Sequence, residues 1–494
     1  MSSARRRLLA TLLPAAVLSL VASCTATKPD AVQSQPTAPQ STLTDAQRQT
    51  QLDSFDHVWT TIRDNHFDPT FNGVDWDAVR TEFRPRVEAA NNADEARAAM
   101  TGMIDRLKQS HFSIIPASSY QAVDVSAAAP IQPASTSTST NPSSNPSPER
   151  DAFAGSNQSE QDAEKQQGVT GLHVWPVGTQ ALVLRVDPGS PADLIGVRPG
   201  WIVSRVGTHD IDAMLKVGRE SLDGKLTADL YLSMTIAHYL SGRPGEVRTV
   251  TFLDAADRPA IRSIGLTKSK AIPAKFGNLP TIWLTHEYRR LESPPPNHNR
   301  VGYFAFSTFF EPALIAAEMQ KAVEDARDLD GLIIDLRGNI GGIGAMAMGI
   351  GGWFVDQPRQ NLGTMTTRQS KLTFVLNPRA KPYTKPLAIL IDGGSASTSE
   401  VLAGGLKDLG RARLFGSTTA GAALPSRIEK LANGDGFQYA FADYVSTGGQ
   451  RLEGLGVQPD QIVIPDRASL LAGRDPVIDA ATAWISSQRP PPTQ

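Results

Sequence analysis

Apolar residues recur at helical spacing in residues 49–120. Phe55, Val58 and Ile62 lie three or four positions apart, and the same spacing returns at residues 98–107. Residues at this spacing share one face of a helix, and an apolar face of this kind packs against a neighbour. We therefore predict a small helical bundle that forms an N-terminal domain over residues 49–120.

The pattern changes to short apolar strands and turns over residues 168–270. A strand is expected at residues 181–186, followed by Gly-Ser-Pro-Ala at 189–192 and Gly-Val-x-Pro-Gly at 196–200. This order of turn residues resembles that of PDZ domains, which bind an extended peptide along a sheet edge. The residues that the resemblance places at this edge are Gly171, Leu172, His173 and Val174. The alternative is a small β domain that serves only as a spacer.

Strands and helices alternate over residues 275–490. Apolar strands are expected at residues 301–306, 331–336 and 387–391, with a helix near 314–326. Such alternation predicts layered α/β structure. The whole chain is therefore expected to be a multidomain α/β protein with a helical bundle, a PDZ-like β domain and an α/β core.

The N-terminus has the pattern of an export signal. Three arginines at positions 5–7 precede an apolar stretch that ends at Leu20, and the small residues after it lead to Cys24. This stretch is too short to span a bilayer as a helix. It resembles a bacterial lipoprotein signal, which implies removal of residues 1–23 and a lipid anchor on Cys24 in the cell envelope. Thr25 after the cysteine implies the periplasmic face of the outer membrane, and an ordinary signal peptide is the alternative.

Two segments have compositions that do not suit a packed core. Residues 24–48 are rich in Ser, Thr, Gln and Pro and are expected to form a flexible tether. Residues 127–167 are rich in Ser, Thr, Pro, Asn and charge, and we predict a disordered insertion there, because such a segment cannot offset its ordering entropy.

Charge and motif content argue against several classes of function. The formal net charge of −2 and the lack of a basic cluster give no sign of a nucleic-acid partner. Neither a metal nor a cofactor is expected, since there is no His-Glu-x-x-His motif or cysteine cluster. Gly342-x-Gly344-x-x-Ala347 fits a dinucleotide fingerprint, but it does not directly follow its strand, and Asp356 comes too early for the ribose partner.

Two turns carry candidate chemistry. Ser397 lies where an apolar strand passes through a Gly turn into a helix, so its hydroxyl is expected at a sheet edge beside helix-terminal N–H groups. This position suits a nucleophile, and the alternative is a serine that only caps the helix. Gly341 and Gly342 follow another apolar strand, and their N–H groups are expected to be free to face a substrate oxyanion.

Three motifs resemble those of S41 peptidases in order and spacing. They are Asp-Leu-Arg-Gly-Asn-x-Gly-Gly at 335–342, Gly-Ser-Ala-Ser-x-Ser-Glu at 394–400 and Leu-Glu-Gly-Leu-Gly-Val-Gln-Pro-Asp at 452–460. The resemblance implies a ClpP/crotonase-like core and an exported serine endopeptidase with Ser397 as its nucleophile. By the same resemblance, the N–H of Thr398 and that of Gly341 or Gly342 would form the oxyanion hole.

The resemblance also bears on the general base, for which this family has two solutions. The carboxy-terminal processing branch uses a lysine 25 residues after the serine, but that position is Ala422 here, so a Ser–Lys dyad is not expected. The tricorn core takes its base from a Ser-His pair after the N-terminal helices, which matches Ser110 and His111. The resemblance therefore implies that His111 is the base and that a tetrad is completed by Ser110, as orienting partner, and by Glu453, through a hydrogen bond mediated by a serine or a water. The alternatives are a structural histidine, a helix-end serine and a surface glutamate.

Peptides or unfolded proteins are the substrates that the resemblance implies. The main alternative is a catalytically inactive lipoprotein scaffold that binds peptides, suggested by Ala422 and by Asn339-Ile340-Gly341, where the family more often has Asn-Pro-Gly or Asn-Gly-Gly. A binder of hydrophobic ligands would need a large apolar cavity, of which the sequence gives no sign. The sequence leaves the substrate and the oligomeric state open, a homo-oligomer included.

Overall fold

The computed structural model describes residues 43–117, 167–222, 224–274, 281–292 and 300–489. The expected signal at 1–23, Cys24, most of the tether and nearly all of the predicted insertion at 127–167 lie outside these residues. Within the described ranges, no helix combines the length and the apolar character that a membrane crossing requires.

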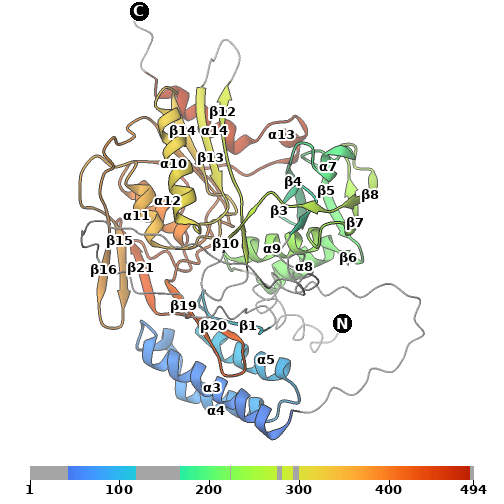
Figure 1. Cartoon of the computed structure of the whole chain (residues 1–494), viewed down its shortest axis with the longest axis vertical. Coiled ribbons are helices and arrows are strands. Elements are labelled where there is room, and N and C mark those ends of the chain that lie inside the picture. Colours follow the sequence, from blue (N-terminus) through green and yellow to red (C-terminus); the bar gives the residue numbers. More distant parts are fainter. Residues whose placement is uncertain (1–42, 118–166, 223, 275–280, 293–299, 490–494) are drawn as a thin grey trace, which may run out of the picture.

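A six-stranded sheet forms the centre of the C-terminal half, with the strand order β12-β13-β14-β17-β18-β22 (Figure 1). Its strands are β12 (His286–Glu292), β13 (Arg300–Phe306), β14 (Gly331–Asp335), β17 (Leu387–Ile391), β18 (Arg413–Gly416) and β22 (Gln461–Ile462). Only β12 runs antiparallel to its neighbour, and the other pairs are parallel. Because β14 and β17 are adjacent and parallel, the turns that follow them meet at one edge of the sheet.

Alternate residues of this sheet pack against helices on its two faces. Val301 and Tyr303 share a buried cluster with Val477 of α14 (Pro476–Ser487). Phe304 and Phe306 lie on the opposite face of the same strand and pack against the other layer. That layer contains α10 (Pro312–Ala326), α11 (Ala345–Gly351) and α12 (Thr398–Asp408), so the alternation predicted from the sequence is present as a layered α/β core.

A smaller sheet flanks this layer. It has the order β16-β15-β21, from β15 (Gln360–Thr367), β16 (Lys371–Leu376) and β21 (Ala442–Ser446). The short strands β10 (Ile272–Ala274) and β11 (Ile282–Leu284) pair just before β12 in the sequence.

Residues 168–268 form a separate sheet domain. Its sheet order is β3-β4-β5-β7-β8, with β3 (Leu172–Val177), β4 (Gln180–Val186), β5 (Ile202–Val206), β7 (Val247–Leu253) and β8 (Pro259–Gly265). Its helices are α7 (Pro191–Leu194), α8 (Ile211–Ser221) and α9 (Ala228–Leu240), and β6 (His209–Asp210) and the β2–β9 pair (Gly168–Val169, Thr267–Lys268) complete it. Helix α13 (Arg467–Leu471) of the C-terminal region docks on this domain, because Leu470 packs with Leu182 and Ile202.

The N-terminal helices share their core with a distant hairpin. They are α3 (Asp45–Asn65), α4 (Trp76–Glu88) and α5 (Ala93–Ile104). Strand β1 (Ser113–Ile115), which follows them, pairs with β20 (Gly436–Ala440), and β20 pairs with β19 (Ser426–Lys430). Phe437 and Tyr439 are buried in the same cluster as Phe55 and Ile62. The bundle is therefore fixed to the C-terminal half through a common core.

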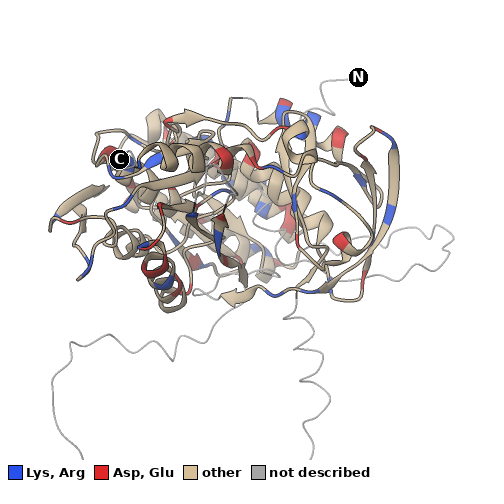
Figure 2. Ribbon diagram, turned by 90° about the horizontal axis from the view of Figure 1, so that it is seen from above, with Lys and Arg blue, Asp and Glu red and all other residues tan. Residues whose placement is uncertain are grey.

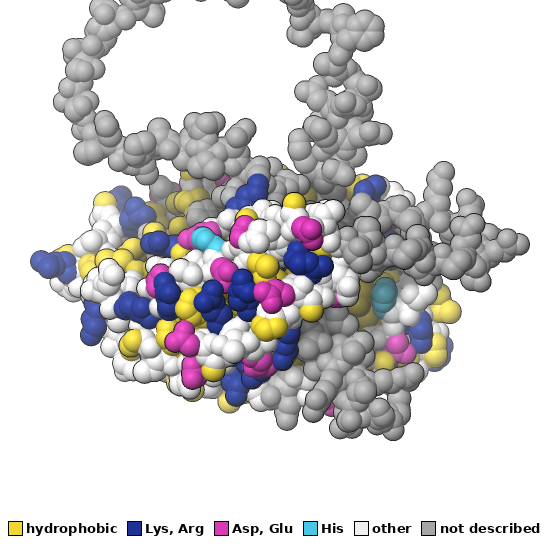
Figure 3. Space-filling model, turned by 90° about the horizontal axis from the view of Figure 1, so that it is seen from below, with side chains coloured by type: hydrophobic (Ala, Val, Ile, Leu, Met, Phe, Trp, Pro, Cys, Tyr) yellow, Lys and Arg dark blue, Asp and Glu magenta, His cyan; other side chains and the backbone are white. Residues whose placement is uncertain are grey.

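Positively and negatively charged residues alternate along the same elements of the ribbon (Figure 2). On the face that contains α3 and α4, lysine and arginine side chains lie beside acidic ones (Figure 3). Arg80 pairs with Asp56, and Arg86 and Arg106 both pair with Glu82. The charge on this face is therefore largely compensated locally.

Candidate active site

Ser397 lies at the sharp turn between β17 and α12. Its backbone has φ 56° and ψ −115°. A left-handed φ is strained for a residue other than glycine and persists only where the surrounding structure holds it. A strained serine at a strand-to-helix turn is the arrangement that presents a nucleophilic hydroxyl at the top of a sheet. The sequence predicted the junction, and the structure adds the strain.

Glu400, on the first turn of α12, holds the segments on both sides of Ser397. Its Oε2 accepts hydrogen bonds from the N–H groups of Ser397 at 2.9 Å and Ala422 at 3.0 Å. Its Oε1 accepts from the Thr419 hydroxyl at 2.6 Å and from the Gly421 N–H at 2.8 Å. Burial raises the pKa of Glu400 to about 7, against these hydrogen bonds, which favour the ionised form. No role for Glu400 was predicted from the sequence, although Ser-x-x-Glu spacing indicates a reciprocal helix cap.

The glycine turn after β14 lies directly against the Ser397 turn. A Cβ added to Gly341 would lie 2.7 Å from the Ser397 Cβ and 2.9 Å from the Thr398 nitrogen, so only glycine fits there. The Gly341 N–H donates to Asn339 Oδ1 at 3.0 Å. Within the described residues, the N–H groups of Gly342 and Thr398 make no hydrogen bond, and Thr398 Oγ1 donates to the Gly342 carbonyl at 2.9 Å. The two free donors therefore belong to Gly342 and Thr398.

Ser110, His111 and Glu453 form a hydrogen-bonded chain. Glu453 Oε1 accepts from the Ser110 N–H at 2.7 Å, and its Oε2 accepts from the Ser110 hydroxyl at 2.8 Å. Ser110 Oγ also lies 2.7 Å from His111 Nδ1. A carboxylate can only accept, so the hydroxyl proton points to Glu453 and Oγ accepts from a proton on Nδ1. This arrangement leaves the lone pair of the neutral imidazole on Nε2.

Desolvation keeps this histidine neutral. Burial lowers the pKa of His111 to about 4, so the ring is uncharged near pH 7 and is able to accept a proton. Burial also raises the pKa of Glu453, while its hydrogen bonds from Ser110 and Ala423 oppose that effect. The backbone φ of His111 is 61°, a second strained position among the predicted site residues.

One short segment links this chain to the nucleophile turn. The Ala423 N–H donates to Glu453 Oε2 at 3.1 Å. The carbonyl of the preceding residue, Ala422, accepts from the Ser397 N–H at 2.8 Å. Ser397 and Glu453 therefore bind two adjacent residues of one segment, Ala422 and Ala423. No hydrogen bond joins the Ser397 hydroxyl to His111 in the part of the chain that the structure describes.

Position 422, where a lysine base would lie, is packed in small apolar residues. Ala422 forms a buried cluster with Ala396 and Ala420, against which Leu230 of α9 packs. The methyl group of Ala422 has no basic atom, so this position cannot supply the base.

The sheet domain lies over the nucleophile turn. A Cβ added to Gly394 would lie 2.5 Å from the Trp175 ring of β3, and one added to Gly393 would lie 2.7 Å from the Asp229 Cβ of α9. Leu230, next along α9, reaches the alanine cluster. Strand β3, which carries the predicted peptide edge, and helix α9 thus both contact the glycine turn that leads to Ser397.

The four residues predicted for peptide binding lie at the start of β3. This strand is at the edge of its sheet and pairs with β4 alone. Gly171 has φ 81°, and a Cβ there would lie 2.1 Å from the Ser190 Cβ. His173 Nε2 lies 2.9 Å from Asp187 Oδ1 and 2.8 Å from an Arg185 nitrogen. Leu172 and Val174 are half-buried against the domain core.

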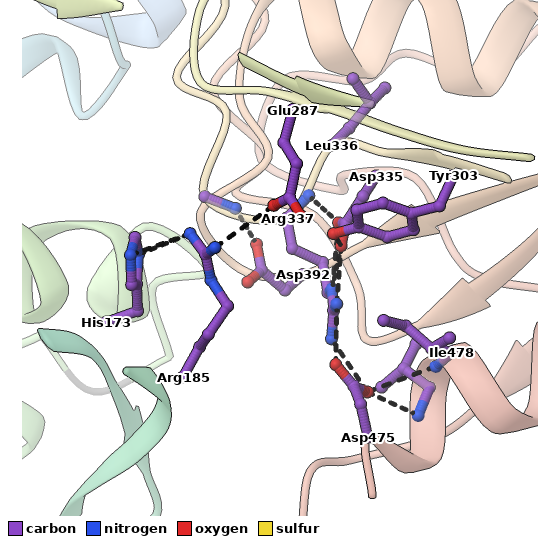
Figure 4. A network of polar contacts seen from close by, with 12 residues as sticks. His173, Arg185, Glu287, Tyr303, Asp335, Leu336, Arg337, Asp392, Asp475 and Ile478 are labelled. Carbon is purple, nitrogen blue, oxygen red and sulfur yellow. Dashed lines mark hydrogen bonds and ion pairs between the residues drawn. The ribbon is translucent and has the colours of Figure 1, made fainter. Parts of the chain in front are cut away.

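A buried ion-pair network braces the motif after β14 (Figure 4). Arg337 pairs with Asp335 at 2.6 Å and with Asp475 at 2.9 Å. The Tyr303 hydroxyl donates to Asp335 at 2.8 Å. Both carboxylates are paired with the one guanidinium, so the network anchors the strand end.

Asp392 ties the two turns together. Its Oδ1 accepts from the Gly338 N–H at 2.8 Å and from the Gly394 N–H at 2.9 Å. Burial raises the pKa of Asp392 to about 6. Arg185 of the sheet domain pairs with Glu287 of β12 at 3.2 Å (Figure 4). Asp392 therefore couples the glycine turn to the nucleophile turn.

Comparison with known proteins shows what this chain is similar to. Residues 300–463 match the model of peptidase family S41, and residues 48–105 match that of the tricorn protease C1 domain. Carboxyl-terminal-processing peptidase 3 of Arabidopsis thaliana is 24% identical over 408 residues, which cover 82% of this chain and 67% of that protein. The carboxyl-terminal-processing protease of Picosynechococcus sp. is 24% identical over 412 residues, with 82% and 81% coverage.

Solved structures show the same fold. A photosystem II D1 C-terminal processing protease aligns with 89% of this chain and 98% of its own, at 21% identity and a TM-score of 0.52. Mature CPAF aligns with 90% of this chain and 97% of its own, at 11% identity and a TM-score of 0.57.

Among the described residues, no group of His, Cys, Asp and Glu is placed to hold a metal ion.

Proposed function

This chain carries a peptidase S41 domain at residues 300–463 and a tricorn C1 domain at 48–105, and we propose that it is a serine endopeptidase with Ser397 as nucleophile and His111 as general base. The observation that carries the proposal is the chain Glu453–Ser110–His111, with contacts of 2.8 Å and 2.7 Å. It joins a carboxylate to an imidazole at the segment that holds Ser397, and it leaves Nε2 free to take a proton.

The proposed reaction begins when His111 Nε2 removes the Ser397 hydroxyl proton as Oγ attacks the peptide carbonyl. The imidazolium that forms donates from Nδ1 to Ser110, whose hydroxyl donates to Glu453, so the carboxylate stabilises the new charge through one intervening group. His111 then protonates the leaving amine, and water releases the acyl-enzyme by the same route.

The carbonyl oxygen becomes negatively charged in the tetrahedral intermediate. We assign its stabilisation to the N–H groups of Gly342 and Thr398, since both are free of internal partners. Gly341 contributes through its lack of a side chain, which lets the two turns approach. Backbone donors fixed in this way stabilise the transition state without reorganisation.

The substrates that this reaction implies are peptides or unfolded proteins. We propose that residues 168–270 act as a PDZ-like domain, which adds an extended segment to the edge of β3. We also propose that residues 1–23 direct export and that a lipid on Cys24 anchors the protein in the bacterial cell envelope. The homology to processing proteases from bacteria and chloroplasts supports the peptidase part of this proposal.

An inactive peptide-binding scaffold is the second candidate. It is favoured by one observation, that no hydrogen bond joins Ser397 to His111 among the described residues. A scaffold would keep the fold and the sheet edge without needing this contact. In the peptidase, substrate binding would draw the two side chains together, since catalytic hydrogen bonds commonly tighten only in the complex.

Labelling with a serine-reactive fluorophosphonate distinguishes the two candidates. Wild type is compared with Ser397→Ala and His111→Ala, and the matched controls are Ser190→Ala, which removes the cap of another helix, and His57→Ala. Labelling that disappears only in the first two variants supports the peptidase. Folded wild type that neither labels nor hydrolyses casein supports the scaffold.

A further inference from the structure

His66 is a buried histidine that the proposed reaction does not use. It follows α3 directly and is 0% exposed. Three aromatic rings surround it, those of Phe67, Phe71 and Phe112, with centroids 4.6, 5.6 and 5.7 Å away. A buried imidazole needs partners for its nitrogens. Nδ1 accepts from the Asp68 N–H at 3.2 Å and lies 2.8 Å from the Asp68 carbonyl oxygen, and Nε2 donates to Gln109 Oε1 at 2.9 Å.

The contacts of His66 bracket the candidate base. Gln109, which it binds, directly precedes Ser110, and Phe112, on which it stacks at an interplanar angle of 19°, directly follows His111. One ring therefore contacts the residues on both sides of the Ser110–His111 pair. The main-chain pairing of β1 with β20 begins only at Ser113.

The backbone of this turn needs such support. Lys108 has φ 53° and His111 has φ 61°, both in the left-handed region. Residues other than glycine stay in this region only where their surroundings impose it. Asn72 holds one end of the turn through Leu107, whose carbonyl accepts from Asn72 Nδ2 at 2.9 Å. Between Leu107 and Ser113, Glu453 binds Ser110, and His66 contacts Gln109 and Phe112.

We propose that His66 is a positioning residue, which holds the 109–112 turn through Gln109 and Phe112 so that Ser110 and His111 face Glu453. The role rests on the proposed function, since it concerns His111 as the general base. His66 itself touches neither the nucleophile turn nor the carboxylate. A role in packing alone would need only an aromatic ring, whereas the contact with Gln109 needs the imidazole nitrogen.

This difference defines the variants. His66→Phe keeps the ring and removes the hydrogen bond, and Gln109→Leu removes the same bond from the other end. The matched control is His57→Phe, because His57 lies on α3, which ends directly before His66, is exposed and pairs with Glu429. Each full-length variant is compared with wild type in kcat, KM, the pH dependence of kcat/KM, the titration of the His111 ring by NMR, and thermal unfolding.

A positioning role predicts that His66→Phe and Gln109→Leu each lower kcat by roughly tenfold with KM within about twofold, since a misplaced base weakens the chemical step more than binding. The double variant is expected to match either single variant, because both remove one bond. The acid limb of kcat/KM and the NMR titration of His111 are expected to move upward from about pH 4, as the relaxed ring gains solvent. His57→Phe leaves every readout at the wild-type value.

The proposal is overturned if His66→Phe lowers the melting temperature while kcat and the His111 titration stay at wild-type values, since that is the behaviour of a packing residue. The proposed function fails separately, when Ser397→Ala and His111→Ala retain wild-type labelling. In that case the NMR titration of His111 still decides whether His66 holds the turn.

Discussion

Ser110 and Glu453 are joined by two hydrogen bonds, from the Ser110 N–H at 2.7 Å and from its hydroxyl at 2.8 Å, although 343 positions separate them in the sequence. The pair connects the end of the N-terminal helices to the loop after β21. The candidate base thus becomes oriented only when these two parts of the chain have come together.

Glu453→Gln tests this pair. An amide offers one oxygen where the carboxylate offers two, so either the N–H or the hydroxyl of Ser110 loses its acceptor, and the imidazolium loses its negative partner. We expect kcat to fall by roughly 100-fold or more, as when the acid of a catalytic triad is replaced. Steady-state kinetics check this, and an unchanged kcat would contradict the role given to Glu453. Glu429→Gln is the control on a neighbouring hairpin.

The pH dependence of kcat/KM is a second prediction. His111 must be neutral to accept a proton, and burial lowers its pKa to about 4. A lowered pKa means that the neutral form persists down to that pH, so activity should be retained through pH 5 and lost near pH 4. Rates measured between pH 3.5 and 8 on folded protein check this. An acid limb near pH 6.5, the ordinary value for histidine, would show that the base is not desolvated in the free enzyme.

Glu400→Gln is expected to disrupt the nucleophile turn. Each carboxylate oxygen of Glu400 accepts two hydrogen bonds, so the amide nitrogen of glutamine would face two donors whichever way it is turned. Two buried donors would lose their acceptor at about 1–3 kcal/mol each. We expect a lower melting temperature and no fluorophosphonate labelling. Retained labelling at the wild-type rate would mean that the turn is held by other contacts.

Arg97→Ala is expected to weaken the join between the bundle and the β19–β20 hairpin. Arg97 donates two hydrogen bonds of 3.0 Å to Asp435, whose side chain is 1% exposed. Removing one partner of a buried pair leaves an uncompensated charge and costs about 3–5 kcal/mol. Urea unfolding measures this loss. Arg86→Ala, which breaks an exposed pair with Glu82, is the control and should change stability by less than about 1 kcal/mol.

The labelling and kinetic variants separate chemistry from stability. Arg97 lies outside the proposed catalytic groups, so its loss should lower stability before it lowers kcat. If Arg97→Ala lowered kcat at temperatures where the protein stays folded, the hairpin would also contribute to orienting the turn that carries His111.

The sequence by itself determined the local elements and the residue types of the site. The 3.6-residue spacing of Phe55, Val58 and Ile62 predicted a helix, and the apolar run before Ser397 predicted the strand-to-helix junction, because both depend on neighbours along the chain. The family resemblance indicated Ser110, His111 and Glu453 as partners and implied a hydrogen bond from Glu453 through a serine or a water, but it gave no geometry for these contacts.

Tertiary structure alone decided how these residues meet. The bonds from Ser110 to Glu453, and those from Thr419, Gly421 and Ala422 to Glu400, join segments that are distant in the sequence and meet only through packing. The shared core of the bundle with Phe437 and the contact of His66 with Gln109 are likewise set by which faces are buried together. Hydrophobic periodicity fixes which face of an element is buried, but not which distant element covers it, and the positions of the catalytic groups depend on that second choice.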